Sequence, residues 1–278
     1  MHLELFTALV FAGSFAAGML GALTGLGGGV VLIPLLTLGF HVDMRYAIGA
    51  SLVSVIATSS GAAAAYVREG YSNVRIGMFL EVATTIGAVV GAFIAGHVPT
   101  RGLAMVFGVV LLYSAWLSRG HHDHETHAEP NPWSEKLGMS GRYPDGRGGW
   151  TAYVVDRIAA GWAMMFGAGI LSGLLGIGSG AVKVLAMDKI MRIPFKVSTT
   201  TSNFMIGVTA AASAGIYLAR GYVDPVLAAP VLLGVLLGAL TGAKVLARAR
   251  VPLLRTIFAW VIAALGVEMI VNGWMGRL

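Results

Sequence analysis

The sequence predicts an all-α polytopic membrane protein with two inverted structural repeats, each a glycine-broken helical hairpin followed by three transmembrane helices. Composition is the first observation behind this prediction. The chain has 278 residues, of which 56% are hydrophobic and 12% are charged, and its mean hydropathy is +0.78. Soluble domains carry about 25% charged residues, so the composition excludes a soluble globular enzyme.

Long apolar segments are the second observation. Runs of about 20 apolar residues with almost no charge are typical of helices that cross a bilayer. The apolar segments lie at 5–39, 46–67, 74–96, 102–118, 153–191, 197–219, 224–247 and 253–274. The polar stretch between the fourth and the fifth has no apolar periodicity and indicates a solvated linker. We therefore expect a first transmembrane repeat at 1–118, a His-bearing linker at 119–152 and a second transmembrane repeat at 153–278.

An internal repeat is the third observation. Residues 17–92 align without a gap on residues 168–243, at an offset of 151, with 18 identities in 76 positions. The identities include the Gly-Tyr pairs at 70–71 and 221–222 and the Gly-x-x-x-Gly patterns that begin at Gly87 and Gly238. We interpret these two patterns as helix-packing faces. Internal duplication is the signature of transporter folds.

The first segment of each half is too long for one crossing. Segments 5–39 and 153–191 contain 35 and 39 residues. A helix of that length would exceed about 50 Å, whereas the hydrocarbon core measures about 30 Å. Glycines at 27–29 and 176–180 interrupt the two segments near their middles. We therefore expect each segment to form a hairpin that enters the membrane and returns.

The distribution of Lys and Arg also favours hairpins. With hairpins, 14 of the 19 basic residues fall on one face and four on the other, and Lys183 lies inside the membrane. With single crossings the two faces would hold nine each. The positive-inside rule therefore places the linker in the cytoplasm and both chain ends outside. Three full helices then separate equivalent points, so the repeats are inverted. The net charge of +6 reflects this orientation, and no nucleic-acid partner is expected.

The glycine breaks are the first candidate for a binding site. Non-helical backbone at membrane depth persists only where it is buried in protein or lines a polar cavity. Helices that restart after a break present free N–H groups and the positive end of their dipole. We expect Gly27, Gly28, Gly29, Gly178, Ser179 and Gly180 to contact an anion. The alternative is that these small residues only allow tight helix packing.

Polar side chains near the breaks extend this candidate site. Lys183 follows Gly180 by three residues and replaces Leu32 of the first half. It could bind a substrate anion or form a structural ion pair. We assign Ser51, Ser202 and Asn203 to substrate binding. The alternative for the run at 198–203 is bonding back to its own helix.

Carboxylates and histidines suggest two further roles. Glu81 lies inside an apolar helix, and we expect it to carry protons, with pairing to a lysine as the alternative. The linker histidines and acids could hold a divalent metal, but their spacing matches no defined site. We expect no metal and no other cofactor. The linker histidines and acids are His121, His122, Asp123, His124, Glu125 and His127.

Enzyme signatures are missing from the sequence. There is no H-E-x-x-H, no G-x-S-x-G and no P-loop. The chain has no cysteine, which excludes disulfides and thiolate chemistry. We therefore expect a protein that is not an enzyme.

Two stretches of the first half, residues 21–34 (GALTGLGGGVVLIP) and 47–51 (AIGAS), resemble the sulfite exporter TauE/SafE family of permeases. Residues 172–180 (SGLLGIGSG) and 200–203 (TTSN) repeat the pattern. The resemblance implies movement of sulfite, sulfonates and related small anions across the plasma (inner) membrane of a prokaryote. Ser179 stands where the first repeat has Gly28, and Lys183 replaces an aliphatic residue.

The sequence therefore predicts a secondary transporter for a small, sulfur-containing anion such as sulfite or an organosulfonate, working by alternating access. One alternative is an uncoupled anion channel or uniporter of the same architecture. Another is a membrane scaffold or sensor without transport. The expected partners are the small anion, the lipid bilayer and a second copy of the chain in a homodimer.

Overall fold

The computed structural model describes residues 3–24, 28–68, 72–117, 138–144, 149–246 and 251–277. The first half consists of α1 (Leu3–Thr24), α2 (Gly29–Pro34), the π-helical η1 (Leu35–Gly39), α3 (Met44–Arg68), α4 (Val74–Ala95) and α5 (Thr100–Leu117). The second half consists of α7 (Ile158–Leu175), α8 (Gly180–Leu185), the π-helical η2 (Ala186–Ile190), α9 (Phe195–Ala219), α10 (Pro225–Leu246) and α11 (Val251–Met275). The two halves thus present the same elements in the same order.

The helices have the length and composition of membrane spans. Within the described residues, five helices are long and apolar enough to cross a bilayer, in α1, α4, α7, α9 and α10. The outer face of α4 exposes large apolar side chains, among them Met78, Val82 and Phe93, while Glu81 on the same helix is buried. A soluble protein rarely exposes so much contiguous apolar surface. The expectation of a polytopic, mainly helical membrane protein is confirmed.

Helices of opposite halves pack in reciprocal pairs. α1 packs on α10, and α4 packs on α7. A methyl group at Gly87 of α4 would collide with the Phe166 carbonyl of α7, and one at Gly238 of α10 would collide with the Phe15 carbonyl of α1. Both contacts relate by the same offset of 151 residues. The glycine patterns serve close helix packing, as the sequence indicated.

Each broken segment ends beside its own start. In the first half, the rings of Phe6 and Phe40 lie 5.9 Å apart, edge to face. In the second half, the Asp156 N–H donates to the Met191 carbonyl at 3.1 Å. The six residues of α2 and the five of η1 together span about 16 Å, or half of a hydrocarbon core. These contacts agree with a segment that enters and turns back.

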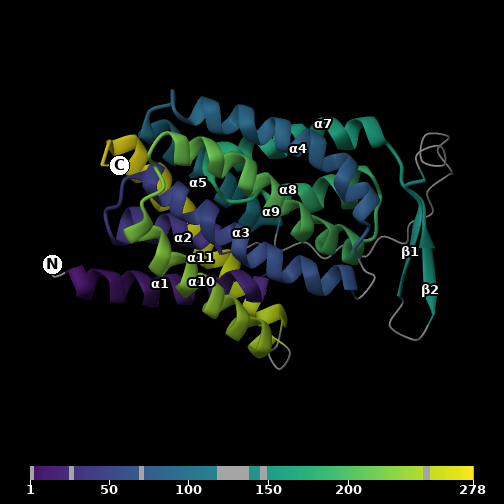
Figure 1. Ribbon diagram of the computed structural model, residues 1–278, viewed down its shortest axis with the longest axis horizontal. Coiled ribbons are helices and arrows are strands. Elements are labelled where there is room, and N and C mark those ends of the chain that lie inside the picture. The colour runs from purple at the N-terminus through teal and green to yellow at the C-terminus, as the bar shows by residue number, and fades with distance from the viewer. Residues whose placement is uncertain are drawn as a thin grey trace.

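Contacts near the helix ends define two faces of the bundle. Arg45, at the start of α3, donates to the Val98 carbonyl at 3.2 Å and to the Tyr222 hydroxyl at 3.2 Å. Arg220, after α9, donates to the Ala92 carbonyl at 2.8 Å. We call this the arginine face. In Figure 1 the chain-end helices α1 and α11 begin and end at one side of the molecule, and a β-hairpin lies at the other, which we call the hairpin face.

The hairpin is a structure that the sequence did not predict. β1 (Gly141–Pro144) pairs antiparallel with β2 (Trp150–Tyr153), and Arg142 lies opposite Ala152. It occupies part of the stretch that we interpreted as a solvated linker. Buried Met139, Tyr153 and Val155 close an apolar cluster with residues of α4, α7, η2 and α9. The histidines and acids at 121–127 lie outside the described residues.

Candidate functional site

The two glycine breaks meet in the middle of the molecule. The Ser51 hydroxyl of α3 donates to the Gly176 carbonyl in the second break at 2.9 Å. Gly29, the first residue of α2, lies against the same hydroxyl and carbonyl. Gly28 precedes it as the N-cap of α2. Gly27 lies outside the described residues. A polar contact therefore connects the break of the first half with that of the second.

The second break has a backbone that most side chains avoid. Gly176 and Gly178 have φ values of 66° and 72°, and Ser179 has a φ of 44°. Glycine adopts this left-handed region without a steric penalty, whereas a serine there is strained. Gly28, the equivalent of Ser179, has an ordinary helical φ of −66°. Positions 28 and 179 therefore differ in backbone conformation as well as in side chain.

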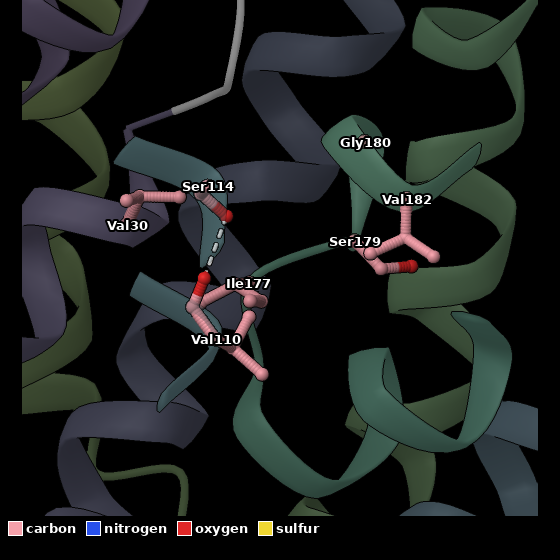
Figure 2. A pocket seen from close by; sticks show the side chains of 7 residues that line it. All are labelled: Val30, Val110, Ser114, Ile177, Ser179, Gly180 and Val182. Carbon is pink, nitrogen blue, oxygen red and sulfur yellow. Dashed lines mark hydrogen bonds between the residues drawn. The ribbon is translucent and has the colours of Figure 1, made fainter. Parts of the chain in front are cut away.

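A small pocket lies where the breaks meet (Figure 2). Its lining residues are Val30, Val110, Ser114, Ile177, Ser179, Gly180 and Val182. They come from α2, from α5 and from the second break with the start of α8. Ser114 donates to the Val110 carbonyl at 2.8 Å, the dashed line in Figure 2. The pocket thus draws residues from both halves.

Ser179 brings an unused hydrogen-bonding group to this pocket. Its side chain is 3% exposed, and its hydroxyl has no hydrogen-bond partner among the described residues. A buried hydroxyl without a partner costs free energy. Neither Gly28 nor Ser179 caps its helix with a side chain, and the first N–H groups of a helix have no partner within it. The pocket therefore offers donors to an acceptor-rich ligand.

A cluster of three residues, two of them charged, joins α4, α8 and α9, and none of the three lines the pocket. Lys183 of α8 is fully buried, and its Nζ lies 4.0 Å from the Glu81 Oε2 of α4. Lys183 also donates to the Thr209 hydroxyl of α9, and Thr209 donates to the Glu81 Oε1 at 2.6 Å. Thr85 donates to the same oxygen at 3.1 Å. We call Glu81, Lys183 and Thr209 the charged triad.

Comparison with known proteins identifies the family. Residues 10–269 match the family model described as sulfite exporter TauE/SafE. The chain belongs to the TauE/SafE family. It is 28% identical over 276 residues to the probable membrane transporter protein YunE of Bacillus subtilis (strain 168), covering 96% of this chain and 98% of YunE. It is 28% identical over 244 residues to YdhB of the same organism, also a probable membrane transporter protein, covering 85% and 89%. No solved structure matches the chain.

The match makes this TauE/SafE protein a multi-pass membrane transporter. Its family is a class of permeases rather than an enzyme class. Both named relatives align over most of their own length.

The structure gathers several residues of the predicted site in this TauE/SafE protein. Gly28, Gly29, Ser51 and the second break lie at the meeting point of the two halves. The Ser202 hydroxyl donates to the Gly180 carbonyl at 3.3 Å. Asn203 follows on α9, half-buried, and is not among the residues that line the pocket.

Lys183 lies on the same short helix as the pocket residues Gly180 and Val182, but its ammonium group points to α4 and α9. Lys183 and Glu81, which we considered separately from the sequence, thus form one ion pair. Glu268, another carboxylate inside an apolar segment, is exposed on α11. The ion pair with Lys183 is the alternative that the sequence analysis gave for Glu81.

The run at 198–203 has mainly structural partners. The hydroxyls of Ser198, Thr199 and Thr200 donate to carbonyls within the preceding five residues. Thr201 accepts the Asn73 N–H at 3.0 Å and so joins the start of α9 to the start of α4. Thr209, whose hydroxyl is bonded to both Lys183 and Glu81, was not among the predicted site residues. Its identity with Thr58 across the repeat was the available signal.

Proposed function

We propose that the chain is a secondary permease that moves a small, sulfur-containing anion, such as sulfite or an organosulfonate, across the plasma membrane by alternating access. The observation that carries the proposal is Ser179, a residue that lines a pocket where both broken segments meet and whose hydroxyl has no partner among the described residues. Oxyanions accept several hydrogen bonds, and N–H groups at helix starts supply them. The description of the family, sulfite exporter TauE/SafE, names the same class of anion.

The proposed binding residues are the break residues and their neighbours. Backbone N–H groups at Gly28, Gly29, Gly178 and Gly180 and the Ser179 hydroxyl would donate to the anion. Ser51 and Ser202 already bond the breaks and would hold their shape. Asn203 remains a proposed contact that requires α9 to move. Gly27 belongs to the proposed set by sequence alone.

Inverted repeats are part of the proposal, and the face contacts support them. α3 begins on the arginine face, where Arg45 contacts Val98. Its equivalent α9 begins on the hairpin face, where Thr201 contacts Asn73. Arg45 and Arg220 belong to the arginine face, and Arg101 lies against Gly276 at the end of α11. Arg45, Arg101 and Arg220, together with Arg277, are the four basic residues on the less basic face in the charge count. We therefore assign the arginine face to the outside and the hairpin face to the cytoplasm.

Reciprocal helix pairs support alternating access. α1 with α10 and α4 with α7 form two tightly packed pairs, each combining the two halves. Transporters built from repeats commonly rock one such unit against the other around a fixed site. The pocket lies between the breaks, where such rocking would open it to one side and then the other.

Uptake into proteoliposomes tests the transport proposal. Labelled sulfite, sulfate and methanesulfonate are offered to vesicles that contain the purified protein, with empty vesicles as the control. We expect saturable uptake of at least one sulfur anion and exchange against the same anion preloaded inside. Flux that neither saturates nor exchanges would favour the channel, and no flux of any of them would overturn the transport proposal.

Variants of two pocket serines localise the site. Ser179→Ala removes the unpartnered hydroxyl, and we expect the KM for uptake to rise about tenfold or more, since a hydrogen bond to a charged group contributes about 1.5–3 kcal/mol. Ser114→Ala is the matched control, because that hydroxyl is already bonded to Val110. Equal effects of the two substitutions would contradict the assignment of Ser179.

A further inference from the structure

The charged triad joins Glu81 of the first half to Lys183 and Thr209 of the second, and the equivalent positions carry no charge. At the equivalent positions the first half has Leu32 for Lys183, and the second half has Leu232 for Glu81. Thr58, the equivalent of Thr209, bonds only to carbonyls of its own helix among the described residues. The duplicated architecture therefore does not need these charges, because the equivalent site, with Leu32, Leu232 and Thr58, does without them.

Few groups face Glu81. α8 contributes Lys183, α9 contributes the Thr209 hydroxyl, and α4 itself contributes the hydroxyls of Thr84 and Thr85. α7, which packs on α4, carries no titratable side chain between Ile158 and Leu175. The ammonium of Lys183 is thus the counter-ion of Glu81 within the described residues, and the pair has no net charge.

A proton on Glu81 would change this balance. The neutral acid leaves the Lys183 ammonium buried without a counter-ion, which is a costly state in a protein interior. Two outcomes relieve it: the proton leaves again, or another anion arrives. Gly180 and Val182, which line the pocket, lie on the same short helix as Lys183. If the Lys183 side chain turned from Glu81 toward the pocket, an anion there would replace the carboxylate.

We propose that the transported anion and the Glu81 carboxylate compete for the Lys183 ammonium, so that one proton on Glu81 and one anion at the breaks bind together. This inference rests on the proposed function and assigns its coupling ion. The proton adds to the Glu81 carboxylate from the aqueous side and is released when the anion leaves and Lys183 returns to Glu81. A monoanion carried with one proton moves no net charge.

Equilibrium binding tests the linkage. Because linkage is reciprocal, protons that favour the anion must raise its affinity as the pH falls, by up to about tenfold for each pH unit for one coupled proton. Calorimetric titration of the purified protein uses methanesulfonate and sulfate, anions that do not change protonation between pH 6 and pH 8. We expect affinity to rise as the pH falls in the wild type.

Glu81→Gln gives the decisive comparison. The amide mimics the protonated acid, so we expect tight binding with less than about twofold change between pH 6 and pH 8. Glu268→Gln is the matched control, an exposed carboxylate in α11, and should keep the wild-type pH dependence. A Glu81→Gln protein that keeps the wild-type pH dependence would overturn the inference.

A second variant covers the case in which Glu81→Gln leaves Lys183 too poorly paired to fold. Glu81→Gln with Lys183→Met removes both charges at once. We expect that protein to bind the anion more weakly than the wild type and independently of pH. A pH dependence retained in the double variant would equally overturn the proposal.

A measurement of proton movement distinguishes failure of the proposed coupling from failure of the proposed transport function. In vesicles that enclose a pH-sensitive dye, an inward methanesulfonate gradient should acidify the lumen with wild-type protein and leave it unchanged with Glu81→Gln. Anion flux without acidification in the wild type would overturn the coupling while the permease stands. If sulfite, sulfate and methanesulfonate all fail to bind the wild type, the proposed transport function is contradicted, and the coupling with it.

Discussion

Gly87 and Gly238 are equivalent residues that make the same contact, whereas Leu32 and Lys183 are equivalent residues that do not. The two glycines each bring a helix of one half against a Phe carbonyl of the other. Leu32 belongs to an apolar core, while Lys183 joins a buried ion pair with Glu81. The shared glycines therefore build the architecture, whereas the buried charges at 81 and 183 are absent from the equivalent positions. The predictions below test this division.

Replacing a shared glycine should have the largest effect. Gly87→Leu and Gly238→Leu should each prevent folding, because the new side chain meets the backbone of the partner helix rather than a movable side chain. Gly167→Leu is the matched control on α7, where a Cβ meets nothing within 4 Å. The amount of monodisperse protein extracted in detergent measures the result. A large loss from only one of the first two variants would break the equivalence of the halves.

Removing the lysine should come next. Lys183→Met leaves a buried carboxylate without its partner and should cost about 3–5 kcal/mol in free energy of unfolding. Leu32→Met, at the equivalent site, should cost less than about 1.5 kcal/mol. Denaturant titration of the purified protein measures both. If the Glu81→Gln and Lys183→Met double variant were no more stable than Lys183→Met alone, the ion pair would lose its assigned role.

Two equivalent helix caps differ in what else they hold. Asn73 accepts the Ile76 N–H at 3.1 Å at the start of α4, and Asp224 accepts the Val226 N–H at 2.9 Å at the start of α10. The Asn73 amide also donates to the Tyr153 hydroxyl at 2.7 Å. Asn73→Ala should therefore cost about 2 kcal/mol, against about 1 kcal/mol for Asp224→Ala. Equal losses of unfolding free energy would show that the hairpin contact adds nothing.

The smallest expected effect is the pH dependence that the Tyr153 hydroxyl gives to the free energy of unfolding. Burial raises the pKa of the Tyr153 hydroxyl above its usual value near 10. Because the folded state disfavours the phenolate, the stability from this group is complete below about pH 10 and is lost as the pH rises through the raised pKa. Stability measured from pH 7 to pH 11 should fall more steeply in the wild type than in Tyr153→Phe. Identical curves would contradict the burial argument.

Labelling from outside tests the assignment of the two faces. The chain has no cysteine of its own, so single cysteines report without background. Gly221→Cys on the arginine face should react with an impermeant thiol reagent in intact cells, whereas Thr151→Cys in the hairpin should be protected until the cells are opened. Labelling of Thr151→Cys alone would reverse the orientation, and labelling of both in intact cells would overturn the assignment of the two faces.

The sequence predicted the parts of the fold that depend on bilayer thickness. Segment 153–191 was too long to cross once, and the contact between Asp156 and Met191 agrees with its return. The hairpin at 141–153 was missed because its strands have only four residues each. Its stability comes from Met139, Tyr153 and Val155 in a cluster with distant helices, which no local pattern reveals.

The candidate site was predicted in part for a similar reason. The glycine breaks are visible as local interruptions of an apolar run, so their residues could be named in advance. The pairing of Glu81 with Lys183 depends on which helices become neighbours, and it is bridged by Thr209 from a third helix. Ser179 was named from its place in the break, but its left-handed backbone and its unpartnered hydroxyl required coordinates.

The two π-helical turns bear on the history of the chain. Residues 35–39 read LLTLG and residues 186–190 read AMDKI, with no identity between them, although the gapless offset of 151 places one on the other. The same rare turn therefore survives where every side chain has changed. π turns occur mostly as single interruptions at functional sites. The two halves therefore share a backbone conformation at this place rather than side chains. A redesign of these ten residues should preserve the length of each five-residue turn, whereas the residue types can change.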